Sequence, residues 1–272
     1  MLRFALILTF AAGFAGIAGA PPVHACGADS DCLVDGGRSY RIRMPQNTAD
    51  ANPGAIFFAH GFRGSSAGVM RNKSLASMAE SLGVALVALD AGGEDWALPG
   101  SPHPPAGRDE MAYADNVIAD VTARFGIDPT RIVASGFSAG AMLVWNLACE
   151  RGSSFAGFVP ISGTFWAPVP ESCASAPASL IHIHGDSDKT VPLLGRPIAR
   201  TRQGAVPKAL AMYARHGDFG PARKQRVGDL SCKTQRNPDG KILAFCAFSG
   251  GHSFRTGFLS QAWGMLAKAG QI

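Results

Sequence analysis

The sequence lacks the usual marks of a metal protein or a repeat protein. It has no Cys-x-x-Cys pair, and its histidines do not stand at metal-ligand spacing beside the cysteines. These absences exclude the common zinc-site patterns. There is also no internal repeat and no low-complexity linker. We therefore expect no metal, no cofactor and no array of small structural units.

Charged residues are few, at 17% of the chain, whereas hydrophobic residues make up 47%. This composition is that of an ordinary globular domain rather than a disordered chain. The formal net charge is +5, and much of it lies in a basic segment, residues 196–226. This segment lacks the regular mixture of basic and aromatic side chains that stacks on bases, so we interpret it as a solvated face and expect no nucleic-acid binding.

Residues 1–25 have the pattern of a secretory signal peptide. Arg3 supplies one positive charge, an apolar stretch of small residues follows, and Val23-His24-Ala25 is typical of a cleavage site. The pattern predicts a secreted or periplasmic protein whose mature chain has no transmembrane segment. Because the same site faintly resembles a bacterial lipoprotein site, lipidation of Cys26 is an alternative. The oligomeric state is not indicated.

All six cysteines follow the predicted signal peptide. An even number of cysteines in an exported chain favours disulfides over free thiols or zinc. The last two flank a turn sequence, Asn237-Pro238-Asp239-Gly240, that would bring two strands face to face. Local spacing predicts three pairs: Cys26–Cys32, Cys149–Cys173 and Cys232–Cys246.

Short apolar runs alternate with helical stretches along the chain. We expect an edge strand at residues 40–44, and further strands at 55–59, 84–89, 131–134, 155–161 and 180–184. Helices are expected at residues 70–82, 110–125, 206–216 and about 254–268. This alternation predicts an α/β fold with a doubly wound, mostly parallel sheet and helices on both faces. Ligands of such sheets bind beyond the carboxyl ends of the strands.

One serine stands between two glycines at a predicted strand-to-helix junction, in Gly136-Phe137-Ser138-Ala139-Gly140. This G-x-S-x-G pattern is typical of a nucleophile elbow, a strained turn that lifts the serine hydroxyl out of the sheet. Side chains at the two glycine positions would collide with the flanking strand and helix. An incidental glycine-rich turn is the alternative, but the strand before and the helix after the motif favour a nucleophile at Ser138.

A serine nucleophile needs a base, and the base needs an acid that orients it. On this fold the expected chain order is serine, aspartate, histidine. That order leaves His216 and His252 as bases; His216 ends a predicted helix, where a cation suits the helix dipole, so we favour His252. Asp186 and Asp188 both lie just past a strand end, and their spacing does not separate them.

Two other groups of residues were weighed as parts of a site. His182 and His184 stand two apart on one strand, but a histidine pair without a third ligand is more often packed than metal-bound. The oxyanion of a serine enzyme needs backbone N–H donors, which we expect from Phe62 and Ala139. His60 is interpreted as a hydrogen-bonded support of the loop that carries Phe62.

These residues together resemble a known family. His60-Gly61-Phe62, Gly136-Phe137-Ser138-Ala139-Gly140, His184-Gly185-x-x-Asp188-x-x-Val191-Pro192 and Gly251-His252 are similar to motifs of secreted α/β-hydrolase esterases known as polyhydroxybutyrate depolymerases, close to feruloyl and acetylxylan esterases. The resemblance extends from about Gly36 to the C-terminus. It implies an α/β-hydrolase catalytic domain over residues 26–272, with Asp188 as the acid.

The activity that the resemblance implies is hydrolysis of carboxylic esters through an acyl-enzyme, on hydroxybutyrate oligomers or on feruloyl and acetyl esters. A serine peptidase on the same fold and a catalytically silent binding protein are the alternatives. Substrate contacts are expected from Trp96, Phe165 and Trp166, which follow strand ends; each of them is equally well explained as an anchor that holds a loop down. Trp145 and Trp263, on predicted helices, are expected in the core.

Overall fold

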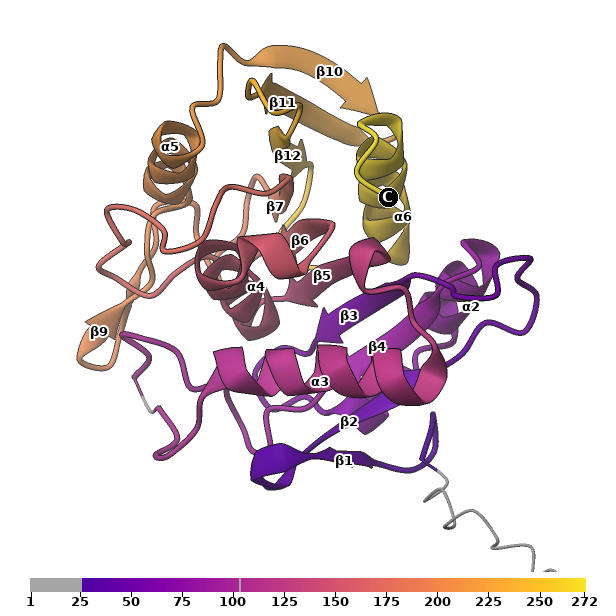
Figure 1. Ribbon diagram of the computed structural model, residues 1–272. Helices are drawn as coiled ribbons and strands as arrows, with labels where there is room; N and C mark the ends of the chain where they lie inside the picture. Colours follow the sequence, from indigo (N-terminus) through magenta and orange to yellow (C-terminus); the bar gives the residue numbers. More distant parts are fainter. Residues whose placement is uncertain (1–25, 103) are drawn as a thin grey trace, which may run out of the picture.

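We describe the protein from a computed structural model, which covers residues 26–102 and 104–272 (Figure 1). The predicted signal peptide lies outside the described residues. Within these ranges no helix is long and apolar enough to cross a membrane.

A single mixed sheet of ten strands forms the centre of the molecule, in the order β1-β2-β4-β3-β5-β6-β7-β12-β11-β10. The strands from β4 to β12 in this order pair in parallel, and antiparallel strands extend both edges. The strands are β1 Cys32–Val34, β2 Arg38–Arg43, β3 Ala55–Ala59, β4 Ala85–Leu89, β5 Ile132–Phe137, β6 Gly157–Ile161, β7 Leu180–Gly185, β10 Arg223–Val227, β11 Leu230–Arg236 and β12 Ile242–Phe248. Two short strands, β8 Pro197–Ile198 and β9 Thr201–Arg202, pair separately.

Helices cover both faces of this sheet (Figure 1). The α-helices are α1 Ser66–Met70, α2 Lys73–Ser81, α3 Glu110–Phe125, α4 Ala139–Glu150, α5 Val206–His216 and α6 Thr256–Lys268. Short 3-10 turns occur at η1 Asp35–Gly37, η2 Pro129–Arg131 and η3 Gly152–Ser154. Every residue of β3, β4 and β6 is buried, because neighbouring side chains on a strand point to opposite faces and both faces are covered.

Two hydrophobic clusters fill the space between the sheet and the helices. Phe57 of β3 packs in the cluster that contains Trp145 and residues of α3, α4 and α5. Its neighbours Ile56 and Phe58 pack on the other face, in the cluster with residues of α2 and α6. The continuous apolar runs of the sequence are therefore confirmed as strands buried on both faces. The α/β-hydrolase architecture, with its mostly parallel sheet and flanking helices, matches the prediction.

One edge of the sheet differs from the prediction. Residues 40–44 were expected to form an edge strand, but β1 pairs outside β2, with Cys32 opposite Tyr40. The short turn η1 reverses the chain directly after β1 and lays it along β2. The predicted helix at residues 70–82 corresponds to α2, which begins only at Lys73 because Asn72 caps it: Asn72 Oδ1 accepts a hydrogen bond from Leu75 N–H at 3.0 Å. The separate short helix α1 ends at Met70.

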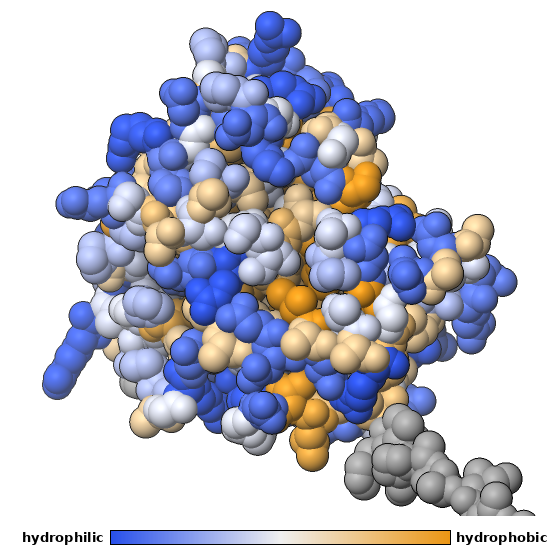
Figure 2. Space-filling view, in the orientation of Figure 1, coloured by the Kyte–Doolittle hydropathy of each residue, from blue (hydrophilic) through white to orange (hydrophobic). Residues whose placement is uncertain are grey.

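The opposite edge strand, β10, was not expected at all. Its sequence, Arg-Lys-Gln-Arg-Val, shows no apolar alternation, so no strand pattern was visible, and its first four residues are exposed. Charged side chains on an edge strand prevent its pairing with other chains, which explains this part of the basic segment. Together with α6, β10 lines a groove of about 990 Å³ that contains neither Ser138 nor His252. Figure 2 shows a mainly hydrophilic surface on one face of the molecule, with small hydrophobic patches.

Three disulfides join the cysteines in the pairs that their spacing predicts. Cys232 and Cys246 face each other across β11 and β12 and brace the hairpin whose second strand leads to His252. Cys149, on α4, is tied to Cys173 in the loop after β6. The sulfur of Cys26 is bonded to Cys32, which contradicts the alternative of lipidation at that sulfur.

Candidate active site

Ser138 occupies a strained turn between β5 and α4. Its backbone has φ 57° and ψ −118°, a conformation that is unfavourable for residues with side chains. A Cβ atom on Gly140 would lie 2.0 Å from Ala59 O, and one on Gly136 would lie 2.6 Å from the Gly140 backbone. Only glycine fits at these two positions, so the G-x-S-x-G pattern has the steric cause that the sequence suggests.

His252 lies between Ser138 and Asp188. Its Nε2 is 3.0 Å from Ser138 Oγ, and its Nδ1 is 2.7 Å from Asp188 Oδ2. Because a carboxylate can only accept, Nδ1 carries the proton and Nε2 is free to accept the serine proton. The Asp188 side chain has no exposed surface, whereas 17% of the His252 side chain is exposed. The histidine therefore has access to substrate and the acid does not.

The structure separates the two aspartates that spacing left equal. Asp188 Oδ1 accepts hydrogen bonds from the N–H groups of Thr190 and Val191, at 2.8 and 2.9 Å, while Oδ2 accepts from His252. Asp186 Oδ1 instead accepts from Gly250 N–H at 3.1 Å and has no contact with the base. Burial alone would raise the pKa of Asp188, but hydrogen bonds from His184, His252 and Val191 lower that pKa to about 2.

The loop after β3, residues 60–64, is here called the oxyanion loop. A Cβ atom on Gly61 would be 3.5 Å from Ser138 Cβ, so this loop lies directly beside the serine. Neither Phe62 N–H nor Ala139 N–H donates a hydrogen bond to another group within residues 26–102 and 104–272. Ala139 is the first residue of α4, where backbone N–H groups have no partner within the helix. Both amides are thus available to a ligand at Ser138.

His60 and Trp96 hold the oxyanion loop from below. Ala91 N–H donates to His60 Nε2 at 3.1 Å, so the ring proton is on Nδ1, which lies 2.8 Å from Gly61 O. Trp96 Nε1–H donates to His60 O at 2.9 Å, and the Trp96 side chain is completely buried. His60 is therefore the support that the sequence suggests. Trp96 is an anchor of the oxyanion loop, and its expected contact with substrate is wrong because the ring has no exposed surface.

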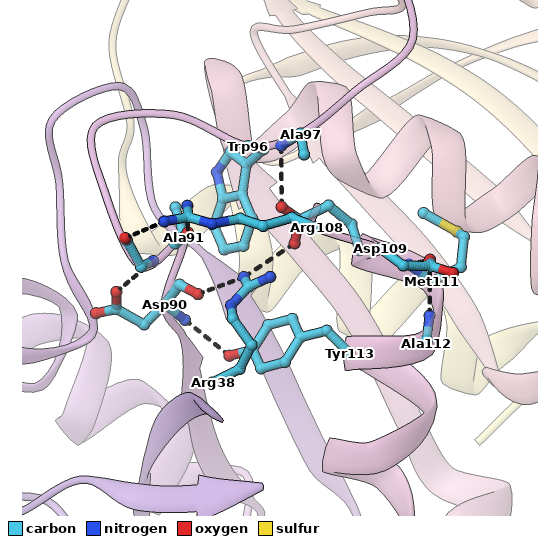
Figure 3. A network of polar contacts seen from close by, with 12 residues as sticks. Arg38, Asp90, Ala91, Trp96, Ala97, Arg108, Asp109, Met111, Ala112 and Tyr113 are labelled. Atoms are coloured by element: carbon cyan, nitrogen blue, oxygen red, sulfur yellow. Dashed lines mark hydrogen bonds and ion pairs between the residues drawn. The ribbon is translucent and has the colours of Figure 1, made fainter. Parts of the chain in front are cut away.

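A network of polar groups fixes the segment that carries Trp96 (Figure 3). Arg38 forms an ion pair with Glu110 at 3.0 Å and also donates to Asp90 O at 2.8 Å. The second oxygen of Glu110 accepts from Ala97 N–H at 2.9 Å. Asp109 accepts from the N–H groups of Met111 and Ala112 and so caps α3. Charged groups of β2 and α3 thus fix the loop that supports His60.

Phe165 and Trp166 are also almost completely buried, with 3% and 8% exposed surface. The Phe165 ring packs 5.4 Å from the Trp145 ring, and Trp166 forms a β-bridge with Gln203. Burial favours the anchoring interpretation over substrate contact for both residues. A largely exposed aromatic side chain, Phe62 at 54%, lies in the oxyanion loop directly after Gly61, although the sequence predicts a role only for its backbone N–H.

The other histidines and tryptophans named in the sequence lie outside the contact between Ser138, His252 and Asp188. His216 Nε2 bonds to Ser175 O at 2.9 Å and takes no part in the site. His182 and His184 are completely buried, with His184 next to Asp188, and Trp145 and Trp263 are in the core. No group of three or more side chains suited to hold a metal occurs in the described part of the chain.

Parts of the sequence are similar to known esterases. The Phospholipase/Carboxylesterase family matches residues 109–206, which include Ser138 and Asp188. A putative esterase, NocK, of Nocardia uniformis subsp. tsuyamanensis is 26% identical over 81% of this chain and 71% of its own length. A probable feruloyl esterase C of Aspergillus terreus is 27% identical over 79% of this chain and 76% of its own.

A solved structure, the acetyl xylan esterase from Aspergillus awamori, superposes with a TM-score of 0.61 and 15% identity, covering 84% of this chain and 94% of that one. The superposition shows a common fold. The chain therefore has the α/β-hydrolase fold, and parts of its sequence are similar to the Phospholipase/Carboxylesterase family and to feruloyl esterase C.

Proposed function

We propose that the protein is a serine esterase that hydrolyses carboxylic esters through an acyl-enzyme. The observation that supports this proposal most strongly is the continuous contact from Ser138 Oγ through His252 to Asp188, at 3.0 and 2.7 Å. The residues fill the roles of nucleophile, base and orienting acid. No cofactor is required by this chemistry.

In the first half of the reaction, Ser138 Oγ attacks the ester carbonyl and its proton passes to His252 Nε2. The negative oxygen of the tetrahedral intermediate accepts hydrogen bonds from Phe62 N–H and Ala139 N–H. When the bond to the alcohol breaks, His252 returns the proton to the leaving oxygen. Water then attacks the acyl-serine with the same base, which releases the acid and regenerates Ser138.

We propose esters of aromatic or short acids as the substrate class, with feruloyl esters preferred. Two observations support this choice: a relative is named feruloyl esterase C, and Phe62, which follows Gly61 in the loop beside Ser138, has a largely exposed side chain. An exposed aromatic ring can stack on an aromatic acyl group, and such contacts contribute about 0.5–1.5 kcal/mol beyond burial. Hydrolysis of acetylated xylan or of hydroxybutyrate oligomers stays a prediction from the sequence resemblance.

The decisive test uses Ser138→Ala beside the wild type. Wild type should react with a fluorophosphonate probe and hydrolyse p-nitrophenyl acetate and methyl ferulate, and the variant should fold normally but lose about 10³-fold or more in kcat/KM. Peptide amides, acetylated xylan and hydroxybutyrate oligomers complete the panel. Cleavage of the peptide alone would indicate a peptidase, and no probe labelling would indicate a silent binding protein.

We also propose that the protein acts outside the cytoplasm. Three disulfides within one chain are typical of proteins that fold in an oxidising compartment. The signal-like residues 1–25 predict export with cleavage before Cys26. N-terminal sequencing of the exported protein should begin at Cys26, and an intact Met1 would contradict cleavage.

A further inference from the structure

A row of buried polar side chains leads from α4 to the catalytic acid. Trp145 Nε1–H donates to His182 Nδ1 at 3.0 Å. His182 Nε2 lies 2.8 Å from His184 Nδ1. His184 Nε2 lies 2.8 Å from Val191 O and 3.4 Å from Asp188 Oδ2. We call Trp145, His182 and His184 the buried row.

The two ends of the row determine where each proton is. An indole N–H can only donate, so His182 Nδ1 must accept and His182 Nε2 must carry the proton. His184 Nδ1 then accepts from His182, which places the His184 proton on Nε2. A carbonyl can only accept, and Val191 O accepts this last proton. Every donor in the row therefore points toward Val191 and Asp188.

Both histidines are neutral in this arrangement. Each ring has one nitrogen that accepts and one that donates, which is the pattern of uncharged imidazole. Burial lowers the pKa of His182 well below its usual value, and His184 lowers it further. The row thus contacts the charged carboxylate of Asp188 through His184.

Burying polar side chains costs free energy unless their polar atoms form hydrogen bonds. Trp145, His182 and His184 have no exposed surface, so each of their polar atoms needs a partner in the core, whereas hydrophobic side chains would need none. His184 is also linked to the acid through Val191, because Val191 O accepts from His184 while Val191 N–H donates to Asp188 Oδ1. His184 and His252 are the titratable groups that contact Asp188 among the described residues.

We propose that His184 is a positioning residue for Asp188, and that Trp145 and His182 fix the tautomer in which the His184 proton faces the acid. Through this contact the row holds Asp188 in the orientation that presents Oδ2 to His252. The inference rests on the proposed serine esterase function. It also has a measurable consequence without catalysis, in the hydrogen bond between Asp188 and His252.

The test compares two substitutions at one position. In His184→Gln the side-chain amide can still donate near the place of imidazole Nε2, whereas His184→Leu fills the core and offers no donor. We measure kcat and KM on p-nitrophenyl acetate, and the low-field proton resonance of His252 Nδ1–H by NMR. His184→Leu should lower kcat about 10- to 100-fold, with KM changed less than about twofold, since misplacement of a catalytic group mainly affects the transition state.

The same substitution should shift or broaden the His252 Nδ1–H resonance. His184→Gln should keep kcat within about threefold of wild type and retain the resonance. Equal losses in the glutamine and leucine variants would reduce His184 to a packing residue and overturn the proposal. So would a folded leucine variant with wild-type kcat and an unchanged resonance. If the wild type hydrolyses no ester but its resonance responds to His184→Leu, the proposed function fails and the positioning role stands.

A second variant, Trp145→Phe, tests the row should His184→Leu fail to fold. It removes only the donor at the start of the row. Nitrogen-15 shifts of histidine separate the protonated ring nitrogen from the bare one, so they report the tautomers of His182 and His184 directly. We expect the shifts of both rings to change and kcat to fall about three- to tenfold. Unchanged shifts together with unchanged kcat would contradict a directing role for Trp145.

Discussion

The two loops that face Ser138 are supported in different ways. The oxyanion loop follows β3 and rests on His60 and Trp96, and the segment that carries Trp96 is fixed by charged groups, namely the ion pair between Arg38 and Glu110. The acid loop, residues 185–192, follows β7 and rests on the neutral buried row. Both supports reach the site from behind a strand end of the same sheet, and neither contacts the reacting atoms.

The difference corresponds to what each loop contributes to the reaction. The oxyanion loop supplies a backbone N–H, and the Arg38–Glu110 ion pair behind it has no net charge, so the pair adds none near the developing oxyanion. The acid loop supplies a carboxylate, and a positive support behind it would weaken the pull of Asp188 on His252. A neutral donor can hold this carboxylate without cancelling its charge. We conclude that the sign and burial of a support are matched to the group that it holds.

The largest effect is expected at the acid loop. Asp188→Asn should lower kcat/KM about 10³- to 10⁴-fold, because an amide cannot hold His252 in the tautomer that accepts the serine proton. Asp186→Asn is the matched control, two residues away on the same loop, and should cost less than about tenfold. Steady-state kinetics on p-nitrophenyl acetate measure both. The reverse order would show that the acid is assigned to the wrong aspartate.

A smaller effect is expected at the oxyanion loop. Trp96→Phe removes the donor to His60 O and leaves a buried carbonyl without its partner, which costs about 1–3 kcal/mol of stability. The loop should then shift, and kcat should fall about tenfold with little change in KM. Trp263→Phe, on α6, is the control and should leave kcat unchanged. Wild-type kcat in a folded Trp96→Phe protein would separate this anchor from catalysis.

Removing a charge from the Arg38–Glu110 ion pair should destabilise the fold more than changing the neutral buried row. Glu110→Gln leaves Arg38 nearly buried without its ion-pair partner, and breaking such a pair costs about 3–5 kcal/mol. Chemical unfolding of Glu110→Gln beside His184→Gln measures the contrast: the first should be clearly destabilised, the second much less. Equal stabilities would remove the distinction between the two supports.

Much of this site follows from local sequence patterns. The elbow glycines and the apolar runs of β3 and β4 leave short patterns that are visible in the sequence. The chain order of Ser138 and His252 is the one expected on this fold. The choice of Asp188 over Asp186 came only from family resemblance, because it depends on where a loop from β12 places His252.

The predictions that failed concern contacts between distant segments. Trp96 follows a strand end, as a substrate-binding residue would, yet it is buried against His60, 36 positions away. The edge strand β10 shows no apolar alternation because one of its edges has no neighbour and its side chains are solvated. The sequence of the histidine pair on β7 does not show whether the pair binds a metal, packs in the core or, as here, donates a hydrogen bond to the acid loop.

The smallest expected effect is the dependence of stability on pH at the acid loop. The folded-state pKa of Asp188 is about 2, against 3.8 for the free side chain, so its ionised form stabilises the fold. That contribution is present above pH 3.8 and is lost as the pH falls toward 2. The stability advantage of wild type over Asp188→Asn, measured by chemical unfolding, should therefore be constant near pH 6 and shrink between about pH 4 and 2. An advantage that stays constant or grows over that interval would show that hydrogen bonds at Asp188 do not favour the carboxylate.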